Sequence, residues 1–590
     1  MVSTNDLRLM ANKLRIASLR STTIAGSGHP TSCLSCAELM SCLFFSELQS
    51  EDEFLLSKGH AAPILWAAYA EAGLIPREEL ETLRKIDSVL EGHPTPKMPL
   101  VRVATGSLGQ GLAAGVGMSL TKRLTGSTGR IYVLLGDGEC AEGSVWEAAN
   151  SATYYRLNNL CVLIDVNRLG QSEPTMHQHD LEPYRDKFRA FGWNALMIDG
   201  HSVSDILNAF DQAQKSKSPC VIIAKTIKGK GVSFLEDKEG WHGKPLNTKE
   251  LEDALQKIGN AEVSLPSQLE LRNSDDGIIA DSEANEYRVG EMVSTRDAFG
   301  KALANCGKKN KTVVAIDADV KNSTMTDYFF REFPDRAFQS FIAEQAMVGM
   351  AVGFSAMGLV PFVATFSAFL TRAYDFIRMA QYSRANIKFV GSHAGISIGP
   401  DGPSQMGLED IPMFLSMPEA VVLYPSDAVS SDYLVKEMSK QKGISYLRTT
   451  RGKTPVIYDK AEQFPIGGLK VVRKSAKDRA LVIAAGITLH EALRAYELLK
   501  EKDIYIRIID LYSLKPLDVD SVRENAQECN NNVIAVEDHY CSAFASILST
   551  VLPDVWYLCV RDIPRSGKPE ELLKHYGVDA LSIVQRVEQM

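Results

Sequence analysis

The chain has 590 residues, of which 45% are hydrophobic and 23% are charged, and its mean hydropathy is −0.09. These values are typical of a globular protein and exclude fibrous and disordered chains. The formal net charge is −9 without a basic block, which argues against sequence-independent nucleic-acid binding, and no apolar run reaches the ~18 to 20 residues of a membrane span. We expect a large enzyme with neither a nucleic-acid nor a membrane partner.

Apolar strand-like runs alternate with helical patterns in three series along the chain. This alternation is typical of parallel βαβ units, so we predict an α/β fold of three doubly wound domains. A polar stretch without periodicity at 264–289 predicts a linker between the first and second series. The predicted domains are 1–262, 292–455 and 456–590, with the linker at 263–291. The clearest strands are 131–135, 160–166 and 220–226, then 312–317, 360–366, 387–393 and 420–426, then 480–486, 504–511 and 532–538.

The ends of the chain and its cysteines bear on location. The N-terminal segment lacks an apolar core of signal-peptide length, and ten cysteines are scattered along the chain. Cys33, Cys36 and Cys42 fall in an apolar helical pattern, and no second Cys or His pair stands at zinc-finger spacing. We expect these three to be small buried hydrophobes, not a redox pair or a zinc site, in a cytoplasmic protein.

Polar residues follow two predicted strands of the first series. The sequence Gly136-Asp137-Gly138-Glu139 comes directly after the strand at 131–135, and Asn167 closes the strand at 160–166. The 30 residues from Asp137 to Asn167 fit one helical crossover and a strand, so both are expected at the carboxyl ends of parallel strands, where open α/β sheets bind ligands. Carboxylate and amide oxygens suit Mg²⁺ or Ca²⁺ that holds a diphosphate.

A dinucleotide-binding fold is the alternative for this segment. Gly136-x-Gly138-x-x-Ala141 fits the loose G-x-G-x-x-G/A fingerprint, and a Gly-Asp-Gly sequence alone is common in turns. Asp137 argues against a dinucleotide, because a carboxylate repels a bare pyrophosphate and attracts a bridging cation. Together with Asn167, it favours the metal–diphosphate site.

Motifs spread over nearly the whole chain resemble those of transketolases, most closely the animal-type enzymes. The GDGE sequence, followed at this interval by an Asn that closes a strand, is similar to the thiamine diphosphate motif. The matching stretches are long and ordered, which makes the resemblance specific. They lie at 25–32, 56–65, 91–97, 104–112, 136–148, 165–172, 224–231, 241–245, 294–300, 321–324, 343–347, 391–406, 446–451 and 564–573.

The resemblance implies that the first domain holds the diphosphate and Mg²⁺ (with Ca²⁺ or Mn²⁺ as substitutes), and the second the aminopyrimidine of thiamine diphosphate. It implies a homodimer with active sites between subunits. The implied reaction transfers a two-carbon ketol unit from xylulose 5-phosphate to ribose 5-phosphate or erythrose 4-phosphate, in the pentose phosphate pathway. Carried over by motif, Asp137 and Asn167 bind the metal by side chain and Leu169 by its carbonyl, while Gly138 lies at the diphosphate.

The resemblance assigns the central catalytic role to Glu344. In family members this carboxyl hydrogen-bonds the aminopyrimidine and promotes formation of the thiazolium ylid. From the residue alone, Glu344 is predicted to be a surface glutamate before a helix. Phe366 and Phe369 are implied to pack on the pyrimidine, and Ser32, which could equally cap a helix, to contact the cofactor. The other implied cofactor contacts are His60, Gly106, Leu108, Lys228 and His242.

Five of the eleven histidines stand in loop motifs that contain Gly: His29, His60, His93, His242 and His393. This setting suits proton transfer near neutral pH, and the lack of i,i+3 or i,i+4 pairs among them argues against zinc. The resemblance implies catalytic roles for His29, His93 and His242. The implied substrate-binding residues, which include two arginines for a phosphate, are His29, His242, Arg296, Ser323, His393, Asp401, Gln405 and Arg448.

Two positions depart from family patterns. Gln405 stands where bacterial and yeast enzymes have His, although animal-type members share Gln, and Ala346 replaces an Asn of close animal relatives. Two alternatives stay open: another thiamine diphosphate reaction on this fold, such as that of deoxyxylulose phosphate synthase or a 2-oxoacid dehydrogenase component, and a catalytically silent scaffold. The presence of Asp137, Asn167 and Glu344 favours an active transketolase-type enzyme.

Overall fold

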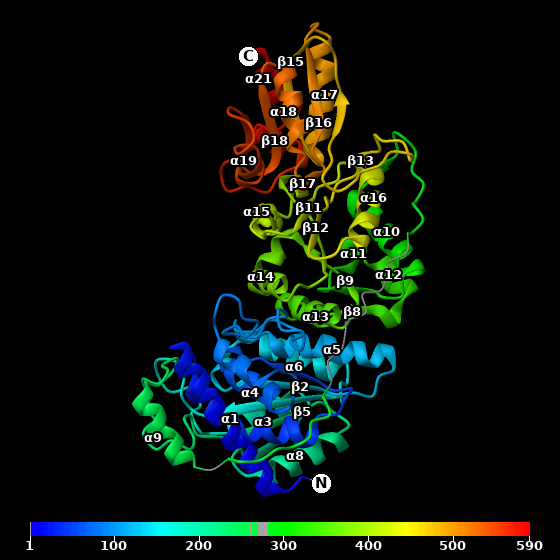
Figure 1. Cartoon of the computed structure of the whole chain (residues 1–590). Coiled ribbons are helices and arrows are strands. Elements are labelled where there is room, and N and C mark those ends of the chain that lie inside the picture. The colour runs from blue at the N-terminus through cyan, green and yellow to red at the C-terminus, as the bar shows by residue number, and fades with distance from the viewer. Residues whose placement is uncertain (1, 260, 270–280) are drawn as a thin grey trace. The chain divides into compact units, whose positions relative to one another are not determined.

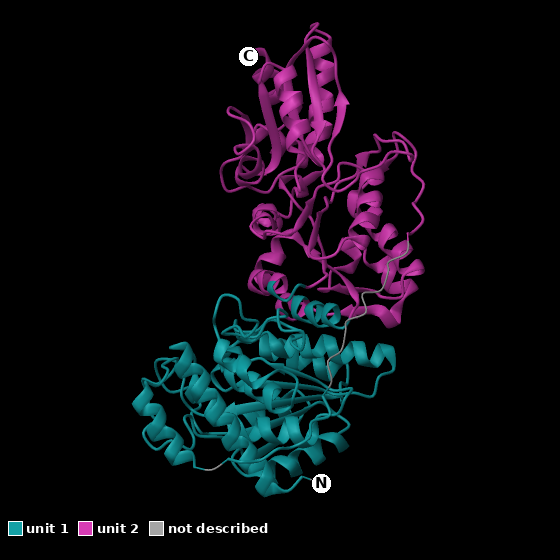
Figure 2. Cartoon of the chain, in the orientation of Figure 1, with its two compact units in different colours: residues 1–275, 348–357, 382–384 teal, residues 276–347, 358–381, 385–590 magenta. Residues whose placement is uncertain are grey.

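A computed structural model describes residues 2–259, 261–269 and 281–590, and the chain divides into two compact units (Figures 1 and 2). Unit 1 comprises residues 1–275, 348–357 and 382–384, and unit 2 comprises residues 276–347, 358–381 and 385–590. Part of the predicted linker, 270–280, lies outside the described residues. The predicted bounds of the three domains stay a prediction.

Unit 1 is built on a parallel sheet of five strands in the order β1-β2-β3-β5-β4. Every residue of β2 and β3 is buried, as expected for central parallel strands with continuous apolar sequences. The strands are β1 (Glu53–Leu56), β2 (Ile131–Gly136), β3 (Leu160–Val166), β4 (Asn194–Asp199) and β5 (Cys220–Lys225). The α-helices are α1 (Thr4–Ala25), α2 (Pro30–Ser35), α3 (Ala37–Cys42), α4 (Ala62–Glu71), α5 (Gly111–Thr125), α6 (Gly143–Tyr154), α7 (Glu182–Ala190), α8 (Val203–Lys215) and α9 (Thr248–Ile258).

Unit 2 contains two larger sheets and a two-stranded one. The seven-stranded sheet has the order β17-β11-β12-β10-β9-β7-β8 and is parallel except for β17, and β13 pairs with β6. The strands of these two sheets are β6 (Met292–Val293), β7 (Val313–Asp317), β8 (Ala337–Gln339), β9 (Val360–Phe366), β10 (Lys388–Ser392), β11 (Val421–Leu423), β12 (Ser445–Arg448), β13 (Thr454–Pro455) and β17 (Ser513–Lys515). The helices of this part are α10 (Thr295–Lys309), α11 (Lys321–Thr324), α12 (Asp327–Glu332), α14 (Tyr374–Tyr382), α15 (Asp410–Leu415) and α16 (Ala428–Lys440), and α13 (Glu344–Ala356) belongs in part to each unit.

The five-stranded sheet of unit 2 has the order β14-β16-β15-β18-β19, with only β14 antiparallel to its neighbour. Its apolar core includes Val482, Ile508 and Ile534, each fully buried. The strands are β14 (Lys470–Arg473), β15 (Asp478–Ala484), β16 (Tyr505–Asp510), β18 (Val533–Tyr540) and β19 (Trp556–Val560), and the helices are α17 (Ile487–Lys500), α18 (Val519–Glu528), α19 (Ser542–Leu548), α20 (Pro569–His575) and α21 (Ala580–Glu588).

The α/β class predicted from the sequence is confirmed. The strands predicted at 160–166 and 360–366 coincide with β3 and β9, and every other predicted strand overlaps an observed one. The ten cysteines are free, and Cys33, Cys36 and Cys42 are buried as predicted. Among the described residues, no helix is long and apolar enough to cross a bilayer.

Candidate active site

A cavity of about 340 Å³ lies at the carboxyl ends of β2 and β3 in unit 1. Gly136 pairs with Asp165 in the register of these strands, so Asp137 and Asn167 follow neighbouring strands, as the sequence predicted. Lys58, Glu139 and Thr175 also line the cavity. The predicted residues that line it are His29, His60, His93, Gly106, Leu108, Asp137, Gly138, Asn167, Leu169, Lys228 and His242.

Asp137 has the surroundings expected of a cation ligand. Its carboxylate accepts hydrogen bonds from the N–H groups of Gly138 (2.9 Å) and Arg168 (2.8 Å) and from the Thr175 hydroxyl (3.0 Å). Burial, and then the charge of Asp165, nevertheless raise the pKa of Asp137 to about 6. A divalent cation beside it would favour the charged carboxylate, so this donor fits a metal.

Asn167 and Leu169 are the other predicted metal ligands. Asn167 Nδ2 donates to the Asp165 carboxylate at 3.0 Å, so Oδ1, which accepts a hydrogen bond from the Leu169 N–H at 3.3 Å, is the side-chain atom that would bind a cation. The Leu169 carbonyl accepts a hydrogen bond from Lys228 Nζ at 2.7 Å. A cation on that carbonyl would repel the Lys228 ammonium, so the full ligand set requires Lys228 to turn to another acceptor, such as His242 Nδ1 at 2.7 Å.

Ser32 lies near this region but does not line the cavity. It stands inside α2, whose N-cap is His29, so the alternative that Ser32 caps a helix is wrong. The side chain is buried, and Oγ has no hydrogen-bond partner. A buried hydroxyl without a partner is costly, and an acceptor on a bound ligand would satisfy it.

Sequence reasoning missed the buried ion pair between Lys58 and Asp165. Ser35 (2.6 Å) and Thr226 also donate hydrogen bonds to Asp165. Burial opposes the charge of Asp165, but Lys58 and these donors outweigh it and lower the pKa of the carboxyl. The signal was an acid inside the apolar strand sequence at 160–166, because a charge at such a position requires a partner.

Four of the predicted histidines cluster at the cavity. The ring of His29 lies 5.3 Å from that of His60, 6.2 Å from that of His93 and 5.0 Å from that of His242, between centroids. Burial, and then neighbouring His93, lower the pKa of His29 to about 4, and burial, and then Lys228, lower that of His242 to about 3. Both imidazoles are therefore neutral at pH 7 and can either donate or accept a hydrogen bond.

Gly106 allows the loop to approach this cluster. Its φ of +130° disfavours a side chain, and a Cβ there would lie 2.8 Å from His93 Cδ2. The backbone of the predicted cofactor residue can thus pass against the imidazole only because the residue is glycine.

In unit 2, Glu344 and the predicted aromatic residues lie near strand ends. Glu344 begins α13 and is 4% exposed, so the alternative of a surface glutamate is wrong. Its Oε2 lies 3.6 Å from Nη1 of Arg372, a side chain that is mostly exposed. Phe366, which ends β9, stacks on the His393 ring with centroids 3.8 Å apart and on the Phe369 ring at 5.3 Å.

Cationic groups surround His393. Burial, and then Arg296 and Arg451, lower the pKa of His393 to about 3. Arg296 Nη1 donates to the Ser323 carbonyl at 2.8 Å, and its buried Nε has no hydrogen-bond partner. Arg451 Nη1 donates to the Asp401 carboxylate at 2.8 Å. Arg296 thus contacts Ser323, Arg451 contacts Asp401, and the charges of both arginines act on His393. Sequence reasoning missed Arg451, although this residue ends the matching stretch 446–451.

The position of Arg448 does not fit the predicted contact with a substrate phosphate. Its guanidinium is 0% exposed, and it pairs with Asp410 (3.0 Å) and Asp538 (2.9 Å). A third donor bonds the Gly407 carbonyl at 3.1 Å. Because the guanidinium is buried and its donors bond these three groups, Arg448 connects β12 to β18. Its charge is not available to a ligand. The sequence motif contains two arginines, and the motif alone did not reveal which one is buried.

Three protein-family models match consecutive parts of the chain. The model described as the transketolase thiamine diphosphate binding domain matches residues 7–295, and the models of the transketolase pyrimidine binding and C-terminal domains match residues 291–456 and 469–583. The chain is thus a thiamine diphosphate-dependent α/β enzyme.

The relatives define the family. Transketolase of Homo sapiens is 47% identical over 604 residues, which cover 98% of this chain and 97% of the relative, and transketolase-like protein 1 of Bos taurus is 41% identical over 99% and 96% of the two chains. The structure of transketolase from Campylobacter jejuni has the same fold, with a TM-score of 0.86, 24% identity and complete coverage of both chains. The chain belongs to the transketolase family. Its reaction is the transfer of a two-carbon ketol unit between sugar phosphates, with thiamine diphosphate and a divalent cation as cofactors.

Proposed function

We propose that the chain uses its two groups of site residues for separate parts of ketol transfer: those of unit 1 hold the diphosphate and its cation, and those of unit 2 hold the pyrimidine and the substrate phosphate. The observation that carries the proposal is the convergence of Asp137, Asn167 and Lys228 on one cavity at the ends of two parallel strands. Open α/β sheets bind ligands at such strand ends. The donor is proposed to be xylulose 5-phosphate, and the acceptor ribose 5-phosphate or erythrose 4-phosphate.

In unit 1, Asp137, Asn167 and the Leu169 carbonyl are proposed to hold Mg²⁺. Lys228 then turns its ammonium towards the diphosphate, while the backbone at Gly106, Leu108 and Gly138 and the side chains of Ser32 and His60 position the cofactor. The bound cofactor supplies a nucleophilic carbon for the ketose carbonyl. The orphaned Ser32 Oγ and the raised pKa of Asp137 support this arrangement, because both report polar groups that a ligand would satisfy.

The histidines of unit 1 are proposed to act on the sugar. His29, His93 and His242 are assigned to the hydroxyl groups and the carbonyl that lose or gain protons during cleavage of the C2–C3 bond. Support comes from the ring distances and from the lowered pKa values of His29 and His242, which keep both imidazoles neutral at pH 7 and able to accept a hydrogen bond from a sugar hydroxyl.

In unit 2, Glu344 is proposed to hold a proton between its carboxyl group and a pyrimidine nitrogen, with Phe366 and Phe369 against the ring. The burial of Glu344 supports this role, because the hydrogen bond would form away from water. The substrate phosphate is assigned to Arg296, Ser323, His393 and the added Arg451, with Asp401 and Gln405 at substrate hydroxyls. Guanidinium groups bind phosphate by two parallel hydrogen bonds, and Arg296 Nε is without a partner.

The proposal extends to a cytoplasmic homodimer in which each active site takes unit 1 residues from one subunit and unit 2 residues from the other. Mixing the variants Asp137→Asn and Glu344→Gln, at a cofactor concentration too low to load Asp137→Asn and under conditions that exchange subunits, tests it. If sites form between subunits, each mixed dimer has one intact site and one doubly altered site, and activity returns. If sites form within one chain, every site carries one substitution and mixing restores nothing.

The reaction itself is tested on protein stripped of cofactor. We expect transfer from xylulose 5-phosphate to ribose 5-phosphate only when thiamine diphosphate and Mg²⁺ are both added. Pyruvate in place of the ketose is the control, and pyruvate consumption without ketose cleavage would move the assignment to another thiamine diphosphate reaction. A folded protein that neither binds the cofactor nor transfers the ketol unit would be the silent scaffold.

A further inference from the structure

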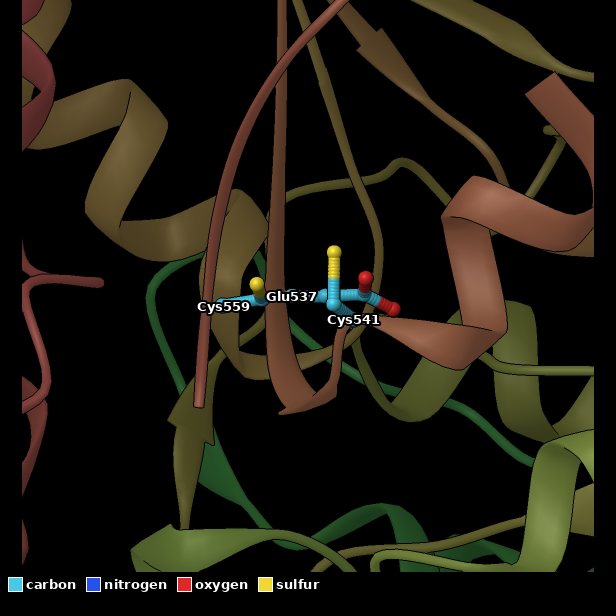
Figure 3. A group of neighbouring side chains, drawn as sticks. All are labelled: Glu537, Cys541 and Cys559. Carbon is cyan, nitrogen blue, oxygen red and sulfur yellow. The ribbon is translucent and has the colours of Figure 1, made fainter. Parts of the chain in front are cut away.

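We propose that Glu537, Cys541 and Cys559 form a binding site for Zn²⁺ in the last sheet of unit 2, separate from the residues assigned to ketol transfer. Within residues 2–259, 261–269 and 281–590, these three form the one group of three or more His, Cys, Asp or Glu side chains with ligand atoms within 4.8 Å of one another. Figure 3 shows the three side chains together.

The backbone brings the three residues together. Glu537 lies in β18 and Cys559 in the adjacent parallel strand β19, while Cys541 directly follows β18 and is the N-cap of α19. Glu537 and Cys559 directly follow the paired residues Val536 and Leu558, at the point where the register of the two strands shifts before Tyr540 pairs with Val560. The ligand positions are thus set by a strand pair and a helix start, and rigid elements hold ligands more accurately than long loops do.

Glu537 supplies the independent sign of a missing ligand. The residue is 3% exposed, and its Oε2 accepts a hydrogen bond from the Phe544 N–H at 2.9 Å. The other oxygen, Oε1, is buried and has no hydrogen-bond partner. A buried carboxylate oxygen without a partner is costly, and a cation between it and the two sulfur atoms would remove that cost.

The donor set selects the metal. Cys559 is 3% exposed, and its sulfur lies within 4.8 Å of that of Cys541, which is partly exposed. Two thiolates and one carboxylate suit Zn²⁺, whereas Mg²⁺ prefers oxygen ligands alone. Each thiol loses its proton to the buffer when the metal binds. Three protein ligands leave the fourth tetrahedral position to water, which can enter on the side of Cys541.

Cobalt(II) is a spectroscopic probe for this site in the full-length, reduced protein. We expect one Co²⁺ per chain with thiolate-to-cobalt charge-transfer absorption in the near ultraviolet, lost on addition of an equimolar amount of Zn²⁺. The predicted magnesium ligands Asp137, Asn167 and Leu169 include no sulfur, so metal bound there is silent in this absorption. The failure of this inference is therefore distinguishable from a failure of the proposed function.

Three variants locate the metal. Cys541→Ser/Cys559→Ser should abolish the charge-transfer absorption, and Glu537→Gln should keep it while weakening Co²⁺ binding by about 10-fold or more. The matched control is Cys161→Ala/Cys220→Ala, which removes two neighbouring thiols paired in the register of β3 and β5 in unit 1 and should leave the absorption unchanged. Far-ultraviolet circular dichroism checks that each variant folds.

A measurement on the unaltered chain covers the case in which a variant does not fold. Zn²⁺ should protect Cys541 from alkylation, by at least about 10-fold in rate, as followed by mass spectrometry of its peptide. Absence of the charge-transfer absorption in the unaltered protein, its persistence in the double serine variant, or an unprotected Cys541 would each overturn the proposal. So would a disulfide between Cys541 and Cys559 in protein kept under reductant, because neither sulfur would then be free to bind.

Discussion

The candidate site residues of the two units differ in the charges that they offer to an anionic ligand. In unit 1 the carboxylate of Asp137 lies at a cavity that Lys58 and Lys228 also line, so a divalent cation beside Asp137 would turn this carboxylate from a repulsive into a bridging group for an anionic ligand. In unit 2 the guanidinium groups of Arg296 and Arg451 act together on His393, so a phosphate can bind directly. The comparison teaches that a net charge of −9 says little about anion binding, because a few placed charges decide it locally.

The largest loss of activity is expected at Glu344, whose proposed role depends on one proton of its carboxyl group. Glu344→Gln keeps the size of the side chain and should lower kcat by about 10²- to 10⁴-fold, the usual range for a lost acid–base group. The matched control is Arg372→Ala, because this exposed partner lies 3.6 Å from Glu344 and its loss should change kcat by only about 2-fold. Steady-state transfer rates with saturating cofactor measure both. Full turnover in Glu344→Gln would refute the proposed role.

The two arginines of the stretch 446–451 provide a direct comparison within unit 2. Arg451→Ala should raise KM for the phosphorylated substrate by about 10- to 150-fold, since a charged hydrogen bond contributes about 1.5–3 kcal/mol, without loss of stability. Arg448→Ala should instead cost about 3–5 kcal/mol of folding stability, because Asp410 and Asp538 would remain buried without their partner.

Substrate titrations and chemical unfolding of both variants separate these two effects. A stable Arg448→Ala protein with a raised KM would reverse our assignment of the two residues.

On the unit 1 side, Asp137→Asn removes a proposed cation ligand while leaving hydrogen-bonding capacity at the cavity. We expect the affinity for Mg²⁺, and with it that for thiamine diphosphate, to fall by about 10- to 100-fold or more. Fluorescence titration of the stripped protein at several Mg²⁺ concentrations gives the affinities, with exposed Asp186→Asn as the control. Equal cofactor affinity in the two variants would exclude Asp137 as a ligand.

The lowered histidine pKa values predict a pH effect on stability. Between about pH 4 and 6.5, His29 remains neutral in the folded chain but takes up a proton on unfolding, so it favours the unfolded state as pH falls through this range. Stability should therefore rise with pH across this window and level off above it. The thermal midpoint of His29→Asn should change less with pH than that of the unaltered protein, and an identical slope would contradict the predicted pKa.

The smallest effect is expected at Gln405, proposed to contact a substrate hydroxyl. Gln405→Ala removes at most a neutral hydrogen bond, so KM should rise by about 2- to 12-fold, which corresponds to about 0.5–1.5 kcal/mol. The neighbouring Ser404→Ala is the control, and initial rates over a range of ketose phosphate concentrations measure both. An unchanged KM would remove Gln405 from the substrate site.

The sequence predicted the fold where its local signals were strong. β3 and β9 are continuous apolar runs, and both were predicted with their observed bounds. β12 was missed, because four residues that include an arginine do not look like a buried strand, yet each of them is buried. Its Arg448 is tolerated there only through two distant carboxylates, which no local pattern reveals.

The site shows the same division. Motifs supplied most of the residues that line the unit 1 cavity, because cofactor contacts lie in short loops with recognisable Gly residues. They supplied neither the Lys58–Asp165 pair nor the choice between Arg448 and Arg451, since both depend on which side chains meet after folding. The roles assigned to the individual site residues stay predictions until the variants are measured.

The ion pairs of Arg448 bear on how this chain can be divided. The guanidinium belongs to β12, whereas Asp538 belongs to β18 of the last sheet, 90 residues further along the chain. If the chain were cut between β12 and β18, one fragment would contain Arg448 without Asp538, and the other would contain Asp538 without Arg448. The last sheet is therefore not a freely exchangeable module, and recombination with a homologue at this point succeeds only when arginine and aspartate are inherited as compatible partners.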